Sequence, residues 1–133
     1  MPVIGFNHFN IRARSPLLEE VRDFYRDVVG LEDGYRPDFG FPGYWMYLNG
    51  QAILHLMDWH IEGEPATFEN THLDHVAFTC EDLTGFESKL AKLNINYRKN
   101  EFKMPDGSQL VQLNVSDPTG NGVELNFMLP ANG

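Results

Sequence analysis

The pattern of apolar and polar positions occurs twice along the chain, at a separation of about 67 residues. FNHFNIRA, over residues 6–13, and LDHVAFTC, over residues 73–80, alternate between apolar and polar positions, which predicts a β-strand in each half. After each strand, over residues 15–30 and 82–95, apolar residues recur at a spacing of three and four, which predicts an amphipathic helix. The repeated order of elements indicates an internal duplication.

Residues near the ends of both predicted helices are typical of helix boundaries. In the first helix, Ser15 is the expected N-cap, Pro16 the first helical residue and Gly30 the terminator. In the second, Thr84 and Glu87 have the spacing of a capping box. The face opposite each apolar stripe is charged, so we expect each helix to cover one side of a β-sheet.

Short segments with the composition of β-strands follow each helix. They are YWMYL and QAILHLM in the first half, and SQLVQLNV and GVELNFM in the second. A further strand about residues 35–41 or 98–103 would complete the order βαβββ in each half. We therefore expect an α+β fold, with two tandem βαβββ modules that form a curved, cup-shaped mixed sheet and carry their helices on its outer face.

The segment IEGEPATFEN, over residues 61–70, contains Gly, Pro and charged residues without periodicity, which predicts a linker. A single domain is expected, with its first module over about residues 1–60 and its second over about residues 71–130. A chain of 133 residues, 42% of them hydrophobic, can bury the core of one compact domain without disulfides. The single Cys80 has no second cysteine in the chain with which to form one.

Four polar residues occupy corresponding positions inside these otherwise apolar strands. His8 and His75 belong to the first strand of each half, and His55 and Glu124 to the last. If the duplicated sheet curls into a cup, the four side chains converge on one point. Three imidazoles and one carboxylate form a ligand set for a divalent metal such as Zn, Fe, Ni, Co or Mn. A lone histidine in a strand is more often a core residue bonded to a backbone carbonyl. The prediction of a metal site therefore rests on the matched positions of the four residues in the two halves of the chain.

The charge distribution narrows the choice of partners. The net charge is −9 and divides almost evenly between the two halves, so there is no basic half or patch. This argues against nucleic acid and anionic membranes as partners. No apolar run approaches the roughly 20 residues of a membrane span, and a cytoplasmic protein is expected. His60 and His72 have no counterpart in the repeat and are predicted to be solvated loop residues.

Several motifs of the chain resemble those of the vicinal oxygen chelate superfamily, which includes glyoxalase I, extradiol dioxygenases, fosfomycin-resistance enzymes and bleomycin-resistance proteins. They are HFNIRA, FYRDVVGLE, GFPGYWMYLNGQAILHL, LDHVAF and VSDPTGNGVELNF, and the resemblance covers about residues 3–128. It implies that the metal positions of the family fall on His8, His55, His75 and Glu124. In glyoxalase I the second position is usually a carboxylate, whereas this chain has His55. The family also often builds its active sites across a homodimer interface, so a homodimer with sites at the interface is expected.

The ligand count distinguishes three candidate functions. Four ligands leave two adjacent positions on an octahedral metal, which suits one bidentate substrate and favours lyase or isomerase chemistry of the glyoxalase type. If His55 acts instead as a general acid or base beside the metal, then His8, His75 and Glu124 form the facial triad of an Fe(II) extradiol dioxygenase. The third candidate is metal-free ligand binding, as in the bleomycin-resistance proteins. Glu124 is the expected proton carrier, because a neutral imidazole bound through one nitrogen has no free lone pair.

Four further residues are candidates for substrate binding. Arg12 lies four residues after the first histidine, where bacterial glyoxalase I proteins have an arginine that helps to hold glutathione, so the resemblance makes glutathione a candidate co-substrate. Asn10 and Arg12 are expected on the strand face that carries His8. Trp45 and Tyr47 belong to an aromatic group that can wall the cavity. The alternatives are a surface salt bridge for Arg12 and ordinary core packing for the aromatic side chains.

Overall fold

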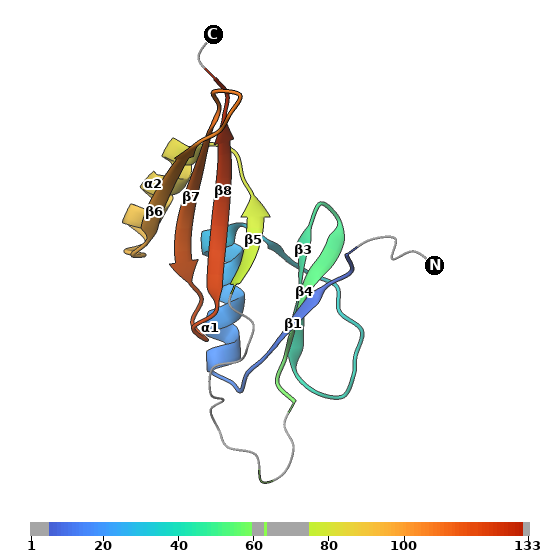
Figure 1. Cartoon of the computed structure of the whole chain (residues 1–133). Coiled ribbons are helices and arrows are strands. Elements are labelled where there is room, and N and C mark those ends of the chain that lie inside the picture. The colour runs from blue at the N-terminus through green and yellow to red at the C-terminus, as the bar shows by residue number, and fades with distance from the viewer. Residues whose placement is uncertain (1–5, 60–62, 64–74, 132–133) are drawn as a thin grey trace. The chain divides into compact units, whose positions relative to one another are not determined.

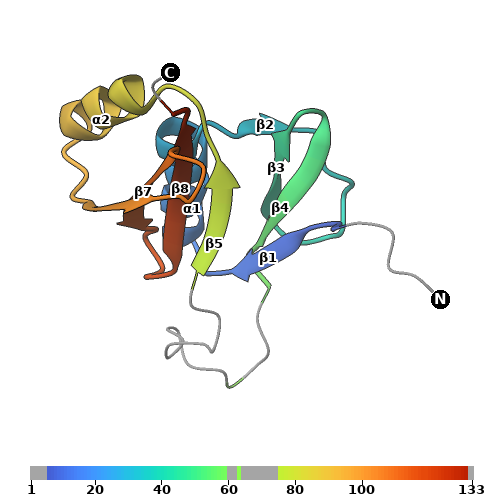
Figure 2. The same ribbon diagram turned by 45° about the horizontal axis from the view of Figure 1, so that its top comes forward.

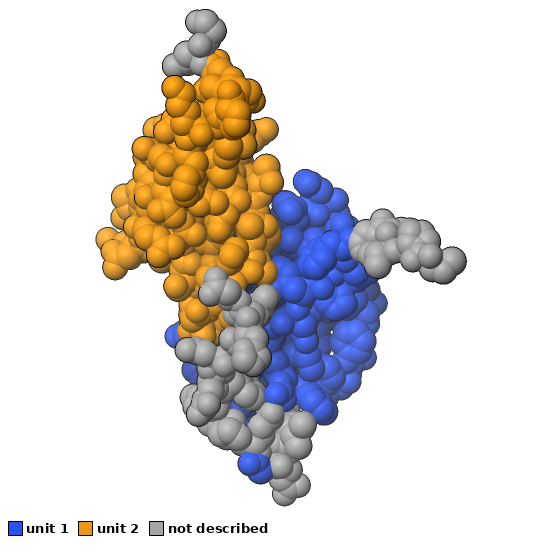
Figure 3. All heavy atoms as spheres, in the orientation of Figure 1, with its two compact units in different colours: residues 1–69 blue, residues 70–133 orange. Residues whose placement is uncertain are grey.

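A computed structural model describes residues 6–59, 63 and 75–131 of the chain (Figure 1). The chain divides into two compact units, Met1–Glu69 and Asn70–Gly133 (Figure 3), and each is described by itself. The predicted linker over residues 61–70 lies outside the described residues apart from Gly63, and His60 and His72 lie outside them as well.

The first unit has a four-stranded mixed sheet with the strand order β1-β4-β3-β2. Its elements are β1 (Phe9–Arg12), α1 (Leu17–Phe24), the π-helical turn η1 (Tyr25–Val29), β2 (Glu32–Gly34), β3 (Gly43–Leu48) and β4 (Gln51–Met57). β1 runs parallel to β4, while the other neighbours are antiparallel. The helix ends where predicted, because Gly30 adopts a positive φ of 97° that favours glycine. The N-cap is Pro16 and not Ser15, whose hydroxyl donates to Glu19 Oε1 at 2.8 Å.

The second unit repeats this topology with the strand order β5-β8-β7-β6 (Figure 1), and Figure 2 shows β8 between β5 and β7. Its elements are β5 (His75–Thr79), α2 (Leu83–Lys92), β6 (Arg98–Lys103), β7 (Gln109–Ser116) and β8 (Gly122–Leu129). The predicted capping box at Thr84 and Glu87 is wrong. α2 begins one residue earlier than Thr84, because the side chain of Asp82 accepts a hydrogen bond from the Gly85 amide at 3.1 Å.

Each sheet has one apolar face that forms the core of its unit. In the first unit, Leu54, Leu56 and Met46 are almost fully buried, as are Leu18 and Val21 of α1. In the second unit, alternate residues of the two central strands form the core. They are Val111, Leu113, Val115, Val123, Leu125 and Phe127, and Leu90 of α2 is buried with them. Because successive side chains of a strand point to opposite faces, the polar residues of the same strands share the other face.

The expected α+β fold of two tandem βαβββ modules is therefore confirmed, with the strands of each unit in a sheet of their own. The strand predicted over residues 98–103 is confirmed as β6, whereas the one over residues 35–41 is wrong, since β2 ends at Gly34. After β2 the Asp38 side chain accepts a hydrogen bond from the Gly40 amide at 2.9 Å, which closes a turn instead of extending a strand. Of the residues described, none lies in a helix long and apolar enough to cross a membrane.

Candidate metal and substrate site

In the first unit, His8 and His55 lie against each other on the polar face of the sheet. Their rings stack with centroids 3.8 Å apart and an angle of 12° between the planes. His55 belongs to β4, and His8 directly precedes β1. The Nδ1 atom of His8 lies 2.6 Å from Asn7 Oδ1, so this contact involves the ring nitrogen Nδ1 and not Nε2.

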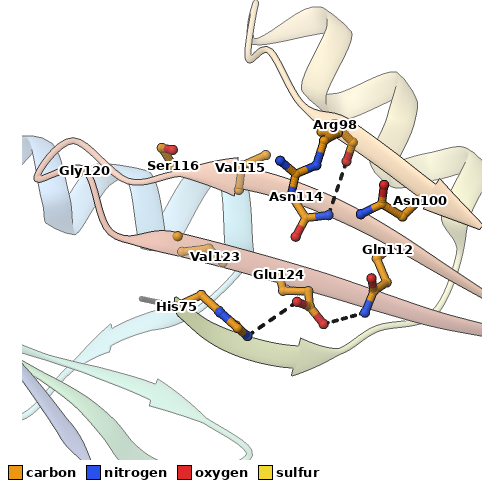
Figure 4. Close-up of a pocket in the computed structure, with 11 residues that line it drawn as sticks. His75, Arg98, Asn100, Gln112, Asn114, Val115, Ser116, Gly120, Val123 and Glu124 are labelled. Atoms are coloured by element: carbon orange, nitrogen blue, oxygen red, sulfur yellow. Dashed lines mark hydrogen bonds and ion pairs between the residues drawn. The ribbon is translucent and has the colours of Figure 1, made fainter. Parts of the chain in front are cut away.

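In the second unit, His75 and Glu124 form the corresponding pair. His75 Nε2 lies 3.5 Å from Glu124 Oε2, and the Glu124 side chain is only 16% exposed (Figure 4). The two residues come from β5 and β8, which are parallel neighbours in the sheet. The pair therefore places one imidazole and one carboxylate at a single point of the polar face.

The strand registers show that the two pairs are equivalent. His55 is paired with Asn10, two residues after His8, and Glu124 is paired with Ala77, two residues after His75. Residues two apart on a strand share a face, so both pairs make the same diagonal step across parallel strands. Each unit thus supplies two of the four predicted metal ligands, in the same way.

Burial affects the protonation of His55. Removal from water lowers the pKa of His55, and the neighbouring His8 lowers it further, because two adjacent imidazolium rings would repel each other. The neutral imidazole, with a free lone pair, is the form that binds metal ions.

In the second unit, burial raises the pKa of the Cys80 thiol, which keeps that thiol protonated.

Gln112 is a site residue that was not predicted from the sequence. Its Nε2 donates a hydrogen bond of 2.7 Å to Oε1 of Glu124, from the neighbouring strand β7 (Figure 4). The bond holds one carboxylate oxygen, while the other oxygen faces His75. The alternation of Gln112, Asn114 and Ser116 with the buried residues of β7 indicates that they share the polar face, but not that Gln112 bonds to Glu124.

A polar pocket of about 420 Å³ lies over the same face of the second unit. His75 and Glu124 line it together with the polar side chains of β6 and β7 (Figure 4). These are Arg98, Asn100, Gln112, Asn114 and Ser116. The volume is in the range of small-molecule sites.

Asn10 and Arg12 lie on the face of β1 that carries the histidine pair, as predicted, and both have contacts within the unit. Asn10 Nδ2 lies 2.9 Å from the sulfur of Met57. Arg12 donates a hydrogen bond of 3.3 Å to the carbonyl of Trp59, and its guanidinium lies 5.8 Å from the centre of the Trp59 indole. Their predicted contact with substrate stays a prediction.

The aromatic residues of β3 divide between the two faces of the sheet. Trp45 stacks on His55 with ring centroids 4.1 Å apart and an angle of 9°, so it forms a wall beside the histidine pair. Tyr47 donates a hydrogen bond of 2.6 Å to the carbonyl of Tyr35, and its ring lies so close to Gly34 that a Cβ there would clash. Tyr44 points to the helix side instead, with the Arg22 guanidinium 4.6 Å from its ring centre.

Over the described ranges 6–59, 63 and 75–131, no three His, Cys, Asp or Glu side chains come together closely enough to hold a metal ion. The two ligand pairs belong to separate units. The structure thus brings His8 together with His55, and His75 together with Glu124.

The fold consists of two βαβββ modules, and each carries a pair of polar side chains on equivalent strands, His8 with His55 and His75 with Glu124. The chain belongs to the Glyoxalase/Bleomycin resistance protein/Dioxygenase superfamily, whose family model matches residues 5–125. This confirms the resemblance inferred from the sequence motifs.

Individual relatives agree with this family. An Arabidopsis thaliana protein named Glyoxylase I 4 is 31% identical over 123 residues, which cover 91% of this chain and 69% of that protein. A glyoxalase family protein from Bacillus anthracis is similar in structure, with a TM-score of 0.72, 25% identity and coverage of 96% and 97% of the two chains. A fosfomycin resistance protein from Listeria monocytogenes, crystallised with Mn(II) and a dihydroxypropylphosphonic acid, has the same fold at a TM-score of 0.65, with 13% identity over 98% and 95% of the chains.

Proposed function

We propose that this protein is a divalent-metal-dependent lyase or isomerase of the glyoxalase type, acting on a small substrate that chelates the metal through two neighbouring oxygens. The observation that carries the proposal is the equivalence of the two pairs, His8 with His55 and His75 with Glu124, in strand register and in face. Unrelated core histidines would have no reason to recur at matched positions on the polar face of both modules.

The donor atoms of the His75–Glu124 pair fit a divalent cation. Two ligands that are each about 2.1 Å from one ion lie no more than about 4.2 Å apart. The 3.5 Å between His75 Nε2 and Glu124 Oε2 is within that limit. A single carboxylate among three neutral imidazoles leaves the site of a divalent ion with a net positive charge, which suits an anionic intermediate. When bound, the metal would polarise the two substrate oxygens and stabilise negative charge on them.

The side chains of the chain itself would position the substrate and move its proton. Glu124 is the proposed proton carrier as well as a proposed ligand, and the hydrogen bond from Gln112 to Oε1 orients its carboxylate. Trp45 would hold the His55 ring in place by stacking and exclude water from one side of it. Asn10 and Arg12 would contact the substrate beside His8, in keeping with their place on that face.

Metal analysis of untagged protein, followed by activity assays, tests the proposal. We expect one divalent ion per site, and isomerisation of a hemithioacetal of glutathione in the presence of Ni, Co, Mn or Zn. Iron together with catechol-dependent oxygen uptake would instead establish the dioxygenase. A protein that contains no stoichiometric metal and takes up none would overturn both enzymatic proposals and leave the metal-free binding protein.

Replacing Gln112 with Leu should lower the affinity for Mn(II) by about tenfold, because the Glu124 carboxylate loses the hydrogen bond that orients it. Isothermal titration calorimetry with Mn(II) alone measures the change. Gln109→Leu is the matched control, because it is the same substitution on the same strand but outside the pocket lining. Equal losses in both variants would show that Gln112 has no specific role.

A further inference from the structure

The polar face of the second unit is organised in rows that run across the strands. One row consists of Arg98, Asn114 and Glu124, because the registers pair Arg98 with Asn114 and Asn114 with Glu124. The next row pairs Asn100 with Gln112 in the same way. Directly opposed side chains on one face of a sheet are neighbours. The pocket thus has the His75–Glu124 pair at one side and a group of hydrogen-bond donors at the other (Figure 4).

Arg98 is the cation of that donor group. In the part of the chain that the structure describes, no carboxylate forms an ion pair with its guanidinium. Arg98 is anchored through its backbone, since its carbonyl lies 3.5 Å from the Asn114 side-chain amide. The amides of Asn100 and Asn114 add further N–H donors beside it. A guanidinium that no carboxylate neutralises, flanked by amide donors, is the chemistry that recognises an oxyanion.

The net charge of the protein affects which molecules are expected to enter this pocket. The chain has a net charge of −9, so its overall field repels anions. Among the residues that line the pocket, Arg98 is the permanent cation and Glu124 the carboxylate. Arg98 would therefore favour the entry of an anionic molecule into this pocket over that of a neutral one.

We infer that Arg98, with Asn114 and Asn100, forms a carboxylate-binding subsite in this pocket, so that the substrate is a small hydroxy or oxo acid whose carboxylate lies within a few bonds of its chelating oxygens. The inference rests on the proposed function, whose substrate class it names. About 10 Å separates the backbone positions of Arg98 and Glu124, which are two strand spacings apart. Arg98 and Glu124 line the same pocket, so a three-carbon acid bound beside Glu124 lies within reach of the long Arg98 side chain.

Calorimetric titration of the protein with glycerate, and with glycerol as its neutral analogue, tests the subsite. We expect glycerate to bind in preference to glycerol, and Arg98→Gln to raise the Kd for glycerate at least about tenfold. Lys103→Gln is the matched control, because it removes one cation from the same strand outside the pocket lining. Its Kd should match that of the unaltered protein.

Equal binding of glycerate by the Arg98→Gln variant, or an equal effect of Lys103→Gln, would overturn the subsite. The titration is repeated after dialysis against a chelator. Binding of glycerate that depends on Arg98 in a protein that takes up no metal would support the subsite and reject the metal-dependent function. Metal uptake and turnover that are independent of Arg98 would support the function and reject the subsite.

Discussion

Replacing Glu124 with Gln is expected to lower the affinity for Mn(II) by more than about 100-fold and to abolish turnover. The variant removes the only carboxylate of the proposed ligand set and the proposed proton carrier in one step. Residues that merely orient a ligand change metal affinity by about 10- to 100-fold, so loss of the carboxylate itself should exceed that range. Calorimetric titration with Mn(II) measures the affinity directly.

The Glu124→Gln substitution should leave the fold intact. The side-chain oxygen of the new amide can still accept the hydrogen bond from Gln112, and the amide has the shape of the carboxylate that it replaces. Met128→Gln is the control on the same strand and face, because Met128 is exposed and lies outside the pocket lining. Equal Mn(II) affinity in the Glu124→Gln variant and the unaltered protein would rule out Glu124 as a ligand.

The second large effect is expected at Asp117, which organises the turn between β7 and β8. Asp117 is 4% exposed, and its Oδ1 accepts hydrogen bonds from the Thr119 amide, the Thr119 hydroxyl and the Asn121 amide at 2.8, 2.6 and 3.0 Å. Replacing it with Ala leaves three donors without their charged acceptor. The free energy of unfolding should fall by about 2–3 kcal/mol, measured by urea unfolding followed by circular dichroism.

Asp106 provides the matched control for this prediction. Its carboxylate accepts hydrogen bonds from the Ser108 amide and hydroxyl at 2.9 and 2.6 Å, in a similar turn, but Asp106 is exposed. Water can replace an exposed acceptor, so Asp106→Ala should cost less than Asp117→Ala. Equal falls in the free energy of unfolding for the two variants would contradict the prediction, because they would show that burial of the turn carboxylate does not affect stability.

The order of the elements was accessible from the sequence, because the periods of strands and helices and the preferences of boundary residues are local properties. The alternating strands about His8 and His75 were located in this way, and Gly30 was identified as the end of the first helix. Local signals failed where two of them competed. Asp82 caps α2 ahead of the predicted capping box, and an Asx turn at Asp38 ends the extended segment after β2.

The residues of the proposed metal site were also accessible, because the duplication placed His8 opposite His75 in the sequence repeat, and His55 opposite Glu124. The strand registers then confirmed that the members of each pair lie on one face. The contacts that surround those pairs were not accessible. Nothing in the sequence near Gln112 indicates that it bonds to Glu124, and nothing near Trp45 indicates that it stacks on His55.

The physical reason is that such contacts depend on strand register. A shift of one residue between neighbouring strands would move every side chain to the other face, and the register is set by the packing of the whole apolar face. The alternation of apolar and polar residues is therefore a property of the local sequence. The choice of neighbours across strands depends instead on the packing of the core beneath them. For that reason His55 and Glu124 could be named from the sequence, while Gln112 and the Arg98 subsite emerged only from the folded sheet.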